Sequence, residues 1–277
     1  MINLISVFAD TEKIYKNSPQ LQSAVENTIK NQYIISDNSQ IKPLSENHRF
    51  TEPAKIFVSM KRSFQAAQNY KEQKVCVLNF ASARHPGGGV KTGASAQEEC
   101  LCRCSTLYFA ISEQNTLKNF HEKHDFMIRN GQMDLTYNDD CIYSPEIVVF
   151  KSDDGAYKYL PEDEQYKVDV ITCAAPNLNR LCNIGGITES KLIQIHESRA
   201  RRILDTAKSE NEDVLILGAF GCGAFRNPPE IVAEVWADVL KDYLFDFKTI
   251  EFAVVSKPAK PSKNYLAFKE IIDLTFG

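Results

Sequence analysis

The sequence has no apolar run long enough to cross a membrane, and its N-terminus does not resemble an export signal. No run reaches the 18 or so apolar residues that mark a candidate bilayer-spanning helix. An acidic residue, Asp10, comes early, and no basic segment followed by an apolar stretch precedes it. Eight cysteines without such a signal indicate reduced thiols rather than a disulfide framework. The sequence therefore predicts a cytoplasmic protein with no membrane partner.

The chain also lacks a strong charge of either sign, internal repeats and low-complexity tracts. Its 32 basic and 36 acidic residues give a net charge of -4. Nucleic-acid-binding proteins usually carry a basic surplus that neutralises phosphates, so sequence-specific nucleic-acid binding is not expected. A local anion site remains compatible with this charge. The 277 residues, 43% hydrophobic and 25% charged, are typical of one large globular domain or a domain with an appendage.

Short apolar runs rich in Val and Ile alternate with longer amphipathic stretches. The predicted strands are KIFVSM, KVCVLNF, EIVVFKS, KVDVITCAA, DVLILGAF and TIEFAVVS, and helices are predicted at 191–209, 228–242 and 263–274. Continuous apolar strands are typical of a sheet that is covered on both faces. We therefore expect a three-layer α/β/α fold with a parallel or mixed sheet over residues 51–277. Residues 1–50 are more polar, with helical patterning near Leu21, and are predicted to form a helical N-terminal extension.

A glycine-rich loop follows the strand VCVLNF. Gly87, Gly88, Gly89 and Gly93 lie between the strand end and the start of a predicted helix. Glycines before a helix N-terminus favour an anion cradle, because free N–H groups and the helix dipole both attract phosphate. The glycine spacing fits neither a P-loop nor the dinucleotide-binding pattern. A flexible surface loop is the alternative interpretation.

The residues Gln97, Glu98 and Glu99 come directly after this loop. Two carboxylates at a helix start could simply be partners of the helix dipole, worth about 0.3–1 kcal/mol. Beside a phosphate cradle, however, their charge would be costly unless a carboxylate had a chemical role. Adjacent helical residues point about 100° apart, because the helix has ~3.6 residues per turn. We therefore expect Glu98 and Glu99 to divide their roles.

A second glycine loop follows the strand DVLILGAF. It contains Gly218, Gly221 and Gly223, and Pro228 and Pro229 begin the next helix. Loops at the carboxyl ends of strands are the usual ligand sites of such sheets. Two glycine loops at one edge could therefore hold a diphosphate from both sides. Residues 174–177, which end another strand, are expected to form only a wall of the pocket.

These motifs together resemble those of microbial-type poly(ADP-ribose) glycohydrolases. The resemblance consists of GGG, seven intervening residues and QEE, together with LNFASARHPGGG and GAFGCGAFRNPP. It covers the chain from about residue 50 onward and implies a macrodomain. It also implies that Glu99 is the catalytic residue, that Glu98 holds ribose hydroxyls and that Asn79 binds the distal ribose. Phe225 would pack against that ribose, with a place in the core as the alternative.

The resemblance implies hydrolysis of ribose–ribose bonds at the ends of poly(ADP-ribose), with release of ADP-ribose. Glu99 would protonate the leaving oxygen and then deprotonate the attacking water. No metal or redox cofactor is implied. Beside the catalytic pair Glu99 and Glu98, the expected substrate-binding residues are Asn79, Gly87, Gly88, Gly89, Val90, Gln97, Gly218, Gly221, Cys222, Gly223, Ala224 and Phe225.

Two other functions remain open from the sequence. One is a macrodomain that binds ADP-ribose without hydrolysing it, although carboxylates next to a phosphate site would bring no benefit to such a reader. The other is hydrolysis of a different ADP-ribosyl linkage, to a protein or a nucleobase in ADP-ribosylated macromolecules. The pocket chemistry of that enzyme would be nearly the same, so the residues do not separate it.

Two further groups are not assigned to the site. His121 and His124 are three residues apart, whereas the zinc-protease motif needs a spacing of four, and we expect both on the surface. Arg199, Arg201 and Arg202 are expected on a solvated helix face, with contact to an extended polyanion as the alternative.

Overall fold

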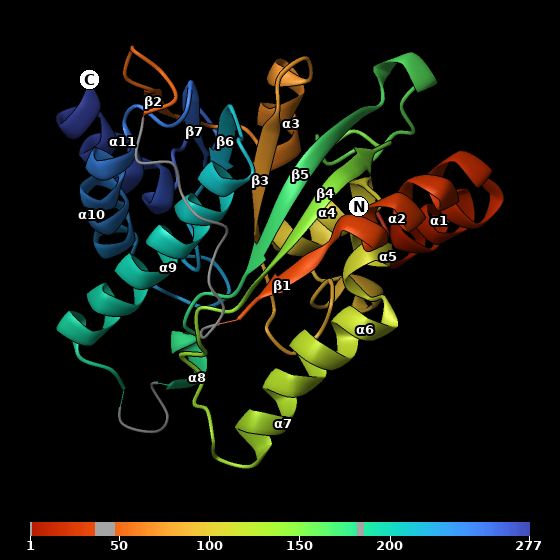
Figure 1. Cartoon of the computed structure of the whole chain (residues 1–277), viewed down its shortest axis with the longest axis horizontal. Coiled ribbons are helices and arrows are strands. Elements are labelled where there is room, and N and C mark those ends of the chain that lie inside the picture. The colour runs from red at the N-terminus through yellow and green to blue at the C-terminus, as the bar shows by residue number, and fades with distance from the viewer. Residues whose placement is uncertain (1, 37–47, 182–185) are drawn as a thin grey trace.

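The centre of the protein is a mixed seven-stranded sheet. The structure, a computed structural model, describes residues 2–36, 48–181 and 186–277. Its strands are β1 (Tyr33–Ile35), β2 (Lys55–Ser59), β3 (Val75–Phe80), β4 (Cys141–Val149), β5 (Tyr166–Cys173), β6 (Val214–Leu217) and β7 (Thr249–Ala253). They lie in the order β1-β4-β5-β3-β6-β7-β2 (Figure 1). The five strands from β5 to β2 run parallel, whereas β4 and β1 pair in the antiparallel direction at one edge.

Helices cover both faces of the sheet, which confirms the predicted α/β/α class. One hydrophobic core lies beneath α9 (Glu189–Ser209), α10 (Pro229–Leu240) and α11 (Lys263–Phe276). The other lies on the opposite face, under α1 (Leu4–Asn17), α3 (Ser63–Ala67), α4 (Gln97–Cys104) and α5 (Leu107–Ile111). All six predicted strands are present, and the three predicted helices are found within three residues of their expected ends.

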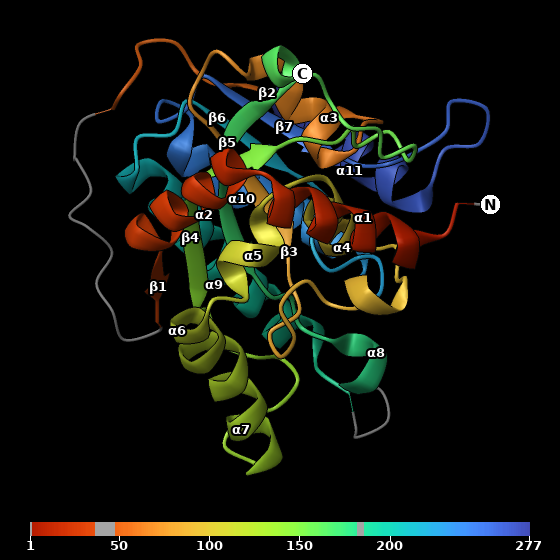
Figure 2. The same ribbon diagram turned by 90° about the vertical axis from the view of Figure 1, so that its right-hand side faces the viewer.

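The remaining helices are short or lie outside these two layers. They are α2 (Pro19–Asn31), α6 (Gln114–Thr116), a π-helical stretch (Leu117–Glu122), α7 (Lys123–Arg129) and α8 (Leu178–Leu181). Helix α7 extends away from the sheet, and α1 and α2 lie side by side across one face of the molecule (Figure 2). Among the described residues, none of the helices has the length and apolar character that a membrane span requires.

The N-terminal segment is helical, as expected, and it is also joined to the sheet. Helices α1 and α2 are followed by β1, which pairs with β4 so that Tyr33 lies opposite Tyr143. The Thr11 hydroxyl donates to the Arg103 carbonyl over 2.6 Å, which ties α1 to α4. The residue pattern predicts no strand here, because β1 has only three residues. The domain boundary at residue 50 stays a prediction.

The expectation that both histidines lie on the surface is wrong. His121 and His124 are fully buried. His124 is within hydrogen-bonding distance of the Phe120 carbonyl, at 2.6 Å, and of Asn138 Oδ1, at 2.8 Å. His121 has the Ala83 carbonyl 3.2 Å from Nδ1. These partners compensate the loss of water at both ring nitrogens of His124 and at Nδ1 of His121, whereas His121 Nε2 has no partner among the described residues. Burial lowers the pKa of His121 to about 4, so its ring is neutral at physiological pH.

The expectation of a solvated arginine face is wrong for Arg199. This side chain is buried, and its Nη1 donates to the Ala174 carbonyl over 2.6 Å. Its Nε lies 3.3 Å from Asp139 Oδ1. Arg199 shares the inner face of α9 with Leu192, His196 and Ile203, at spacings of seven, three and four residues, and this helical period decides its burial.

Candidate active site

A cavity of about 600 Å³ opens at the carboxyl ends of the parallel strands. Its walls include residues that end or follow four of these strands, namely Phe80 at the end of β3, Ala175 after β5, Ala219 after β6 and Val254 after β7. This is the edge at which the sequence predicted the ligand site. The predicted wall at residues 174–177 is confirmed for Ala175 and Asn177, which both line the cavity.

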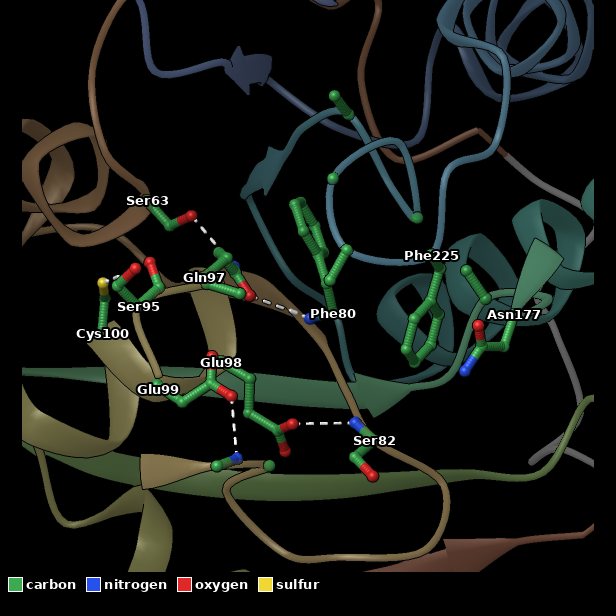
Figure 3. Close-up of a pocket in the computed structure, with 18 of the residues that line it drawn as sticks. Ser63, Phe80, Ser82, Ser95, Gln97, Glu98, Glu99, Cys100, Asn177 and Phe225 are labelled. Atoms are coloured by element: carbon green, nitrogen blue, oxygen red, sulfur yellow. Dashed lines mark hydrogen bonds between the residues drawn. The ribbon is translucent and has the colours of Figure 1, made fainter. Parts of the chain in front are cut away.

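The first residue of α4 fastens this helix to the end of β3. Gln97 Oε1 accepts the Phe80 N–H over 2.9 Å (Figure 3). Gln97 Nε2 donates to the Leu78 carbonyl over 2.7 Å. Nε2 also donates to the Ser63 hydroxyl over 3.0 Å. The side-chain amide of Gln97 therefore pairs with backbone groups of β3 in the way that a neighbouring strand would. This arrangement fixes where the next two residues, Glu98 and Glu99, enter the cavity.

Both oxygens of Glu98 are committed to backbone N–H groups. Oε2 accepts the Ser82 N–H over 2.8 Å (Figure 3), and Oε1 accepts the Gly87 N–H over 3.1 Å. Burial raises the pKa of Glu98 to about 8; the N–H of Ser82 opposes the shift and the charge of Glu99 adds to it. Glu98 therefore holds the loop in shape and tends to keep a proton near neutral pH.

Glu99 has one anchored oxygen and one uncommitted oxygen. Oε1 accepts the Gly89 N–H over 2.8 Å (Figure 3). Oε2 is buried and has no hydrogen-bond partner among the described residues, and the side chain lines the cavity. An unpaired buried carboxylate oxygen costs about 1–3 kcal/mol or more, so its place in a cavity indicates a ligand that pairs with it. The expected division of roles between the two glutamates is present in their hydrogen bonds.

The glycine turn holds these carboxylates rather than an external anion. The N–H groups of Gly87 and Gly89 bind Glu98 and Glu99, and that of Gly88 donates to the His85 carbonyl over 3.0 Å. The expected phosphate cradle is therefore filled by the chain itself. Free N–H groups of a glycine turn attract any anion, and here the glutamates of α4 supply it.

The second glycine loop has a rigid base. Asn227 Nδ2 donates to the Pro176 carbonyl over 2.8 Å and to the Gly221 carbonyl over 3.0 Å. Asn227 Oδ1 lies 2.9 Å from Nε2 of His196 on α9. Gly221 has a φ of +76°, and a Cβ added there would meet Asn227 Nδ2 at 2.6 Å. Only glycine fits between these neighbours, and the loop is held in one shape.

The tip of the second loop offers free backbone amides to the cavity. The N–H groups of Gly223, Ala224 and Phe225 find no acceptor within the part of the chain that the structure describes. All three residues line the cavity. Successive open N–H groups form an anion-binding concavity. This loop, unlike the first, is therefore free to bind phosphate.

Comparison with known proteins identifies the family. The chain matches the family model described as microbial-type PARG, catalytic domain, over residues 8–152, which is more than half of its 277 residues. It belongs to the microbial-type poly(ADP-ribose) glycohydrolase family. No curated protein matches the chain.

Solved structures of poly(ADP-ribose) glycohydrolases from two bacteria are similar to this family member over nearly their whole length. The enzyme from Thermomonospora curvata has a TM-score of 0.84 and 30% identity, covering 97% of this chain and 98% of that one. The same enzyme bound to the inhibitor ADP-HPD has a TM-score of 0.79 and 29% identity, with coverages of 96% and 98%. The enzyme from Deinococcus radiodurans in complex with ADP-ribose has a TM-score of 0.76 and 30% identity, with coverages of 90% and 97%.

In this microbial-type glycohydrolase, most of the expected site residues lie together. Those that line the cavity are Gly88, Gly89, Gln97, Glu98, Glu99, Gly221, Gly223, Ala224 and Phe225. Those that do not line it are Asn79, Gly87, Val90, Gly218 and Cys222. Asn79 is fully buried and donates to Thr172 Oγ1 over 3.2 Å, and its hydrogen bond with Glu98 acts to lower the pKa of that carboxyl. The expected contact of Asn79 with ribose stays a prediction.

Phe225 is half-buried, with one side on the core and the other on the cavity. The centre of its ring lies 6.4 Å from that of Tyr137, which also lines the cavity. Tyr137 has a φ of +60°, a conformation that a bulky residue rarely adopts and that marks many ligand sites. Nearby, Asn177 Oδ1 is buried without a hydrogen-bond partner in the described residues. These three side chains form one end of the cavity (Figure 3 labels Phe225 and Asn177).

Several cavity residues were not found from the sequence. They include Arg62, Ser63, Phe80, Arg84, Tyr137 and Arg180. Arg62 and Ser63 follow β2, so the rule that ligands lie beyond strand ends could have indicated them. Tyr137 and Arg180 lie outside the glycine motifs and are brought to the cavity only by the fold.

Proposed function

We propose that this chain hydrolyses the ribose–ribose glycosidic bond at the ends of poly(ADP-ribose) and releases ADP-ribose, with Glu99 as the acid and base. The observation that carries this proposal is the uncommitted Glu99 Oε2, which is buried at the cavity wall while Oε1 is fixed by Gly89. Membership of the glycohydrolase family supports the reaction class. The cytoplasmic location stays a prediction from the sequence.

The reaction needs a proton for the leaving oxygen and a base for the water. Cleavage passes through an oxocarbenium-like state, and Glu99 Oε2 gives its proton to the departing ribose hydroxyl. The resulting carboxylate then takes a proton from the water that attacks the anomeric carbon. The raised pKa of Glu98, about 8, means that Glu98 keeps its proton near neutral pH and adds little negative charge beside Glu99. Such acid–base catalysis contributes about 10²–10⁴-fold.

The rest of the cavity orients the substrate. The open N–H groups of the second loop hold the diphosphate, and Phe225 packs against the distal ribose. Fixing both groups brings the anomeric carbon to Glu99, and such positioning supplies much of the rate of enzymes that join or cleave bound groups. A reader that binds ADP-ribose without hydrolysis is disfavoured, because it would have no use for the buried, unpaired oxygen of Glu99.

The substitution Glu99→Gln tests the proposal. Glutamine still accepts the Gly89 N–H but cannot supply a carboxylic proton. We expect turnover of poly(ADP-ribose) to fall by about 10²–10⁴-fold, with ADP-ribose affinity measured by calorimetry largely kept. Glu122→Gln, at an exposed position on the π-helical stretch, is the matched control. Wild-type turnover of Glu99→Gln would contradict the role of this residue.

The same assay separates the alternatives. Pure protein is incubated with poly(ADP-ribose), with singly ADP-ribosylated protein and with singly ADP-ribosylated DNA, and free ADP-ribose is measured. Early release of single ADP-ribose units from the polymer is expected. If ADP-ribose is released only from the singly modified substrates, the enzyme cleaves an ADP-ribosyl–protein or ADP-ribosyl–nucleobase bond and not the ribose–ribose bond. Binding without any release would favour a reader that does not hydrolyse ADP-ribose.

A further inference from the structure

We propose that Arg84 and Arg180 form a second anion subsite, which binds the diphosphate of the ADP-ribose unit on the leaving-group side of the scissile bond. This inference rests on the proposed function and deepens it. It names the part of the polymer that the enzyme recognises beyond the terminal unit.

The two arginines approach the cavity from different segments. Arg84 lies in the loop between β3 and the glycine turn, and Arg180 lies on α8, after β5. Both line the cavity, together with Tyr137. Burial raises the pKa of Tyr137, whereas the positive charges of Arg84 and Arg180 act in the opposite direction, so both guanidinium groups are close enough to influence its hydroxyl.

The positive charge of this region is not balanced by the surrounding carboxylates. Arg84 Nε donates to Asp125 Oδ1 over 2.6 Å, but the same carboxylate also binds Arg129 Nε, at 2.7 Å from Oδ2. Arg180 has no acidic partner among the described residues and is exposed. Arg84 and Arg129 therefore share one carboxylate and Arg180 has none, so these four side chains carry a net charge of two positive units. A diphosphate carries two negative charges at neutral pH and matches this surplus.

The position of the arginines places them on the leaving-group side. The loop of Arg84 also contains Gly89, which anchors Glu99, and the Asn179 N–H next to Arg180 donates to the Phe225 carbonyl over 3.1 Å. Both guanidinium groups lie near Tyr137, whose ring centre is 6.4 Å from that of Phe225. Because both arginines line the same cavity as Glu99, we assign this end of the cavity to the leaving-group side. The terminal diphosphate already has the N–H groups of the second loop as partners.

The chemistry of the polymer brings a second diphosphate to this region. The leaving oxygen is a ribose hydroxyl of the next adenosine, and that ribose carries its own diphosphate on its 5′ carbon. This diphosphate therefore lies one sugar ring away from the scissile bond. An ADP-ribose attached to a protein side chain has no such group. The subsite would therefore favour polymer over singly modified protein.

The experiment compares binding of one and two ADP-ribose units. The full-length Glu99→Gln variant, which is proposed to bind without cleaving, is titrated with ADP-ribose and with a purified ADP-ribose dimer. Arg180→Ala and Arg84→Gln are added to it singly and together. We expect each to weaken dimer binding by about fivefold, as for an exposed charge pair, with ADP-ribose binding unchanged. The salt dependence of dimer affinity should also become weaker.

A matched control exists in the same ion cluster. Arg129→Ala removes a cation that binds the same Asp125 but is 71% exposed and does not line the cavity. It should leave dimer binding unchanged. In otherwise wild-type protein, Arg180→Ala should raise the KM for polymer without changing kcat.

Three results would overturn the inference. Unchanged dimer affinity in the double variant would exclude the subsite. Equal weakening of ADP-ribose and dimer would assign the arginines to the terminal unit. An effect of Arg129→Ala as large as that of Arg84→Gln would show only a general charge effect. The turnover of Glu99→Gln is measured first, because it decides separately whether Glu99 is the acid and whether the dimer stays intact during the titration. If Glu99→Gln cleaves the dimer, the KM of Arg180→Ala for polymer in otherwise wild-type protein tests the subsite instead, and an unchanged KM excludes it.

Discussion

The placement of Glu99 depends on the absence of a side chain at Gly88. Gly88 has a φ of +55°, and a Cβ added there would lie 2.5 Å from Glu99 Oε1 and 3.1 Å from Glu98 Oε2. Ordinary van der Waals contact begins at 3.4 Å, so Gly88→Ala forces the Glu99 oxygen to retreat by about 0.9 Å. That shift strains the 2.8 Å bond from the Gly89 N–H, which anchors the carboxylate.

The expected effect on catalysis is large compared with the effect on stability. A displacement of about 1 Å at a reacting group can lower the rate by roughly 10²-fold. We therefore expect kcat on poly(ADP-ribose) to fall by about that factor. The left-handed backbone also costs a non-glycine residue about 1–2 kcal/mol, which lowers the melting temperature by several degrees.

Gly131→Ala separates these two effects. Gly131 has a φ of +66°, so alanine pays a similar backbone cost, but a Cβ there meets nothing within 4 Å. This control should lose similar stability and keep its turnover. Turnover is measured as ADP-ribose release at saturating polymer, and stability by thermal melting. If Gly88→Ala and Gly131→Ala have equal kcat, the contact between Gly88 and Glu99 does not position the acid and the reasoning is refuted.

Two further predictions concern the same cavity. Because the pKa of Glu98 is raised to about 8, Glu98 loses its proton as pH rises through that value, and its negative charge then appears beside Glu99. We therefore expect kcat to decline above pH 8. If Glu98 is the source, this decline should be absent in Glu98→Gln. Asn227→Ala removes the hydrogen bonds that hold the second loop. We expect the free energy of unfolding to fall by roughly 2–3 kcal/mol, measured by thermal melting, and ADP-ribose binding to weaken, measured by calorimetry. Asn130→Ala, at an exposed position, is the control and should change neither.

The fold could be predicted from the sequence where burial imposes a regular pattern. The strand Val75–Phe80 is apolar except for Asn79, because helices cover both faces of the sheet. The pattern failed for Tyr33–Ile35, because three residues are too few to show a period. It also failed for Arg199, because the sequence alone gives no partner for a buried charge. Here Asp139 and backbone carbonyls provide those partners.

The site could be predicted where it rests on local sequence. The glycines and the adjacent Glu98 and Glu99 are close in the chain, and the cavity contains both glutamates as expected. Arg84, Tyr137 and Arg180 come from separate segments, and only the strand order brings them to one edge. The positive φ of Tyr137 is set by its surroundings and leaves no trace in the sequence.

The two glycine turns have opposite electrostatic roles, and this difference removes an apparent conflict in the site. Carboxylates beside a diphosphate should repel it, yet the N–H groups of Gly87 and Gly89 donate directly to Glu98 and Glu99 and offset their charge. The raised pKa of Glu98 lowers the negative charge of the pair further near neutral pH. The second turn keeps its N–H groups of residues 223–225 open for phosphate. The first turn thus lowers the repulsion between the two glutamates and the diphosphate of the substrate. The second turn attracts that diphosphate, so neither turn could replace the other.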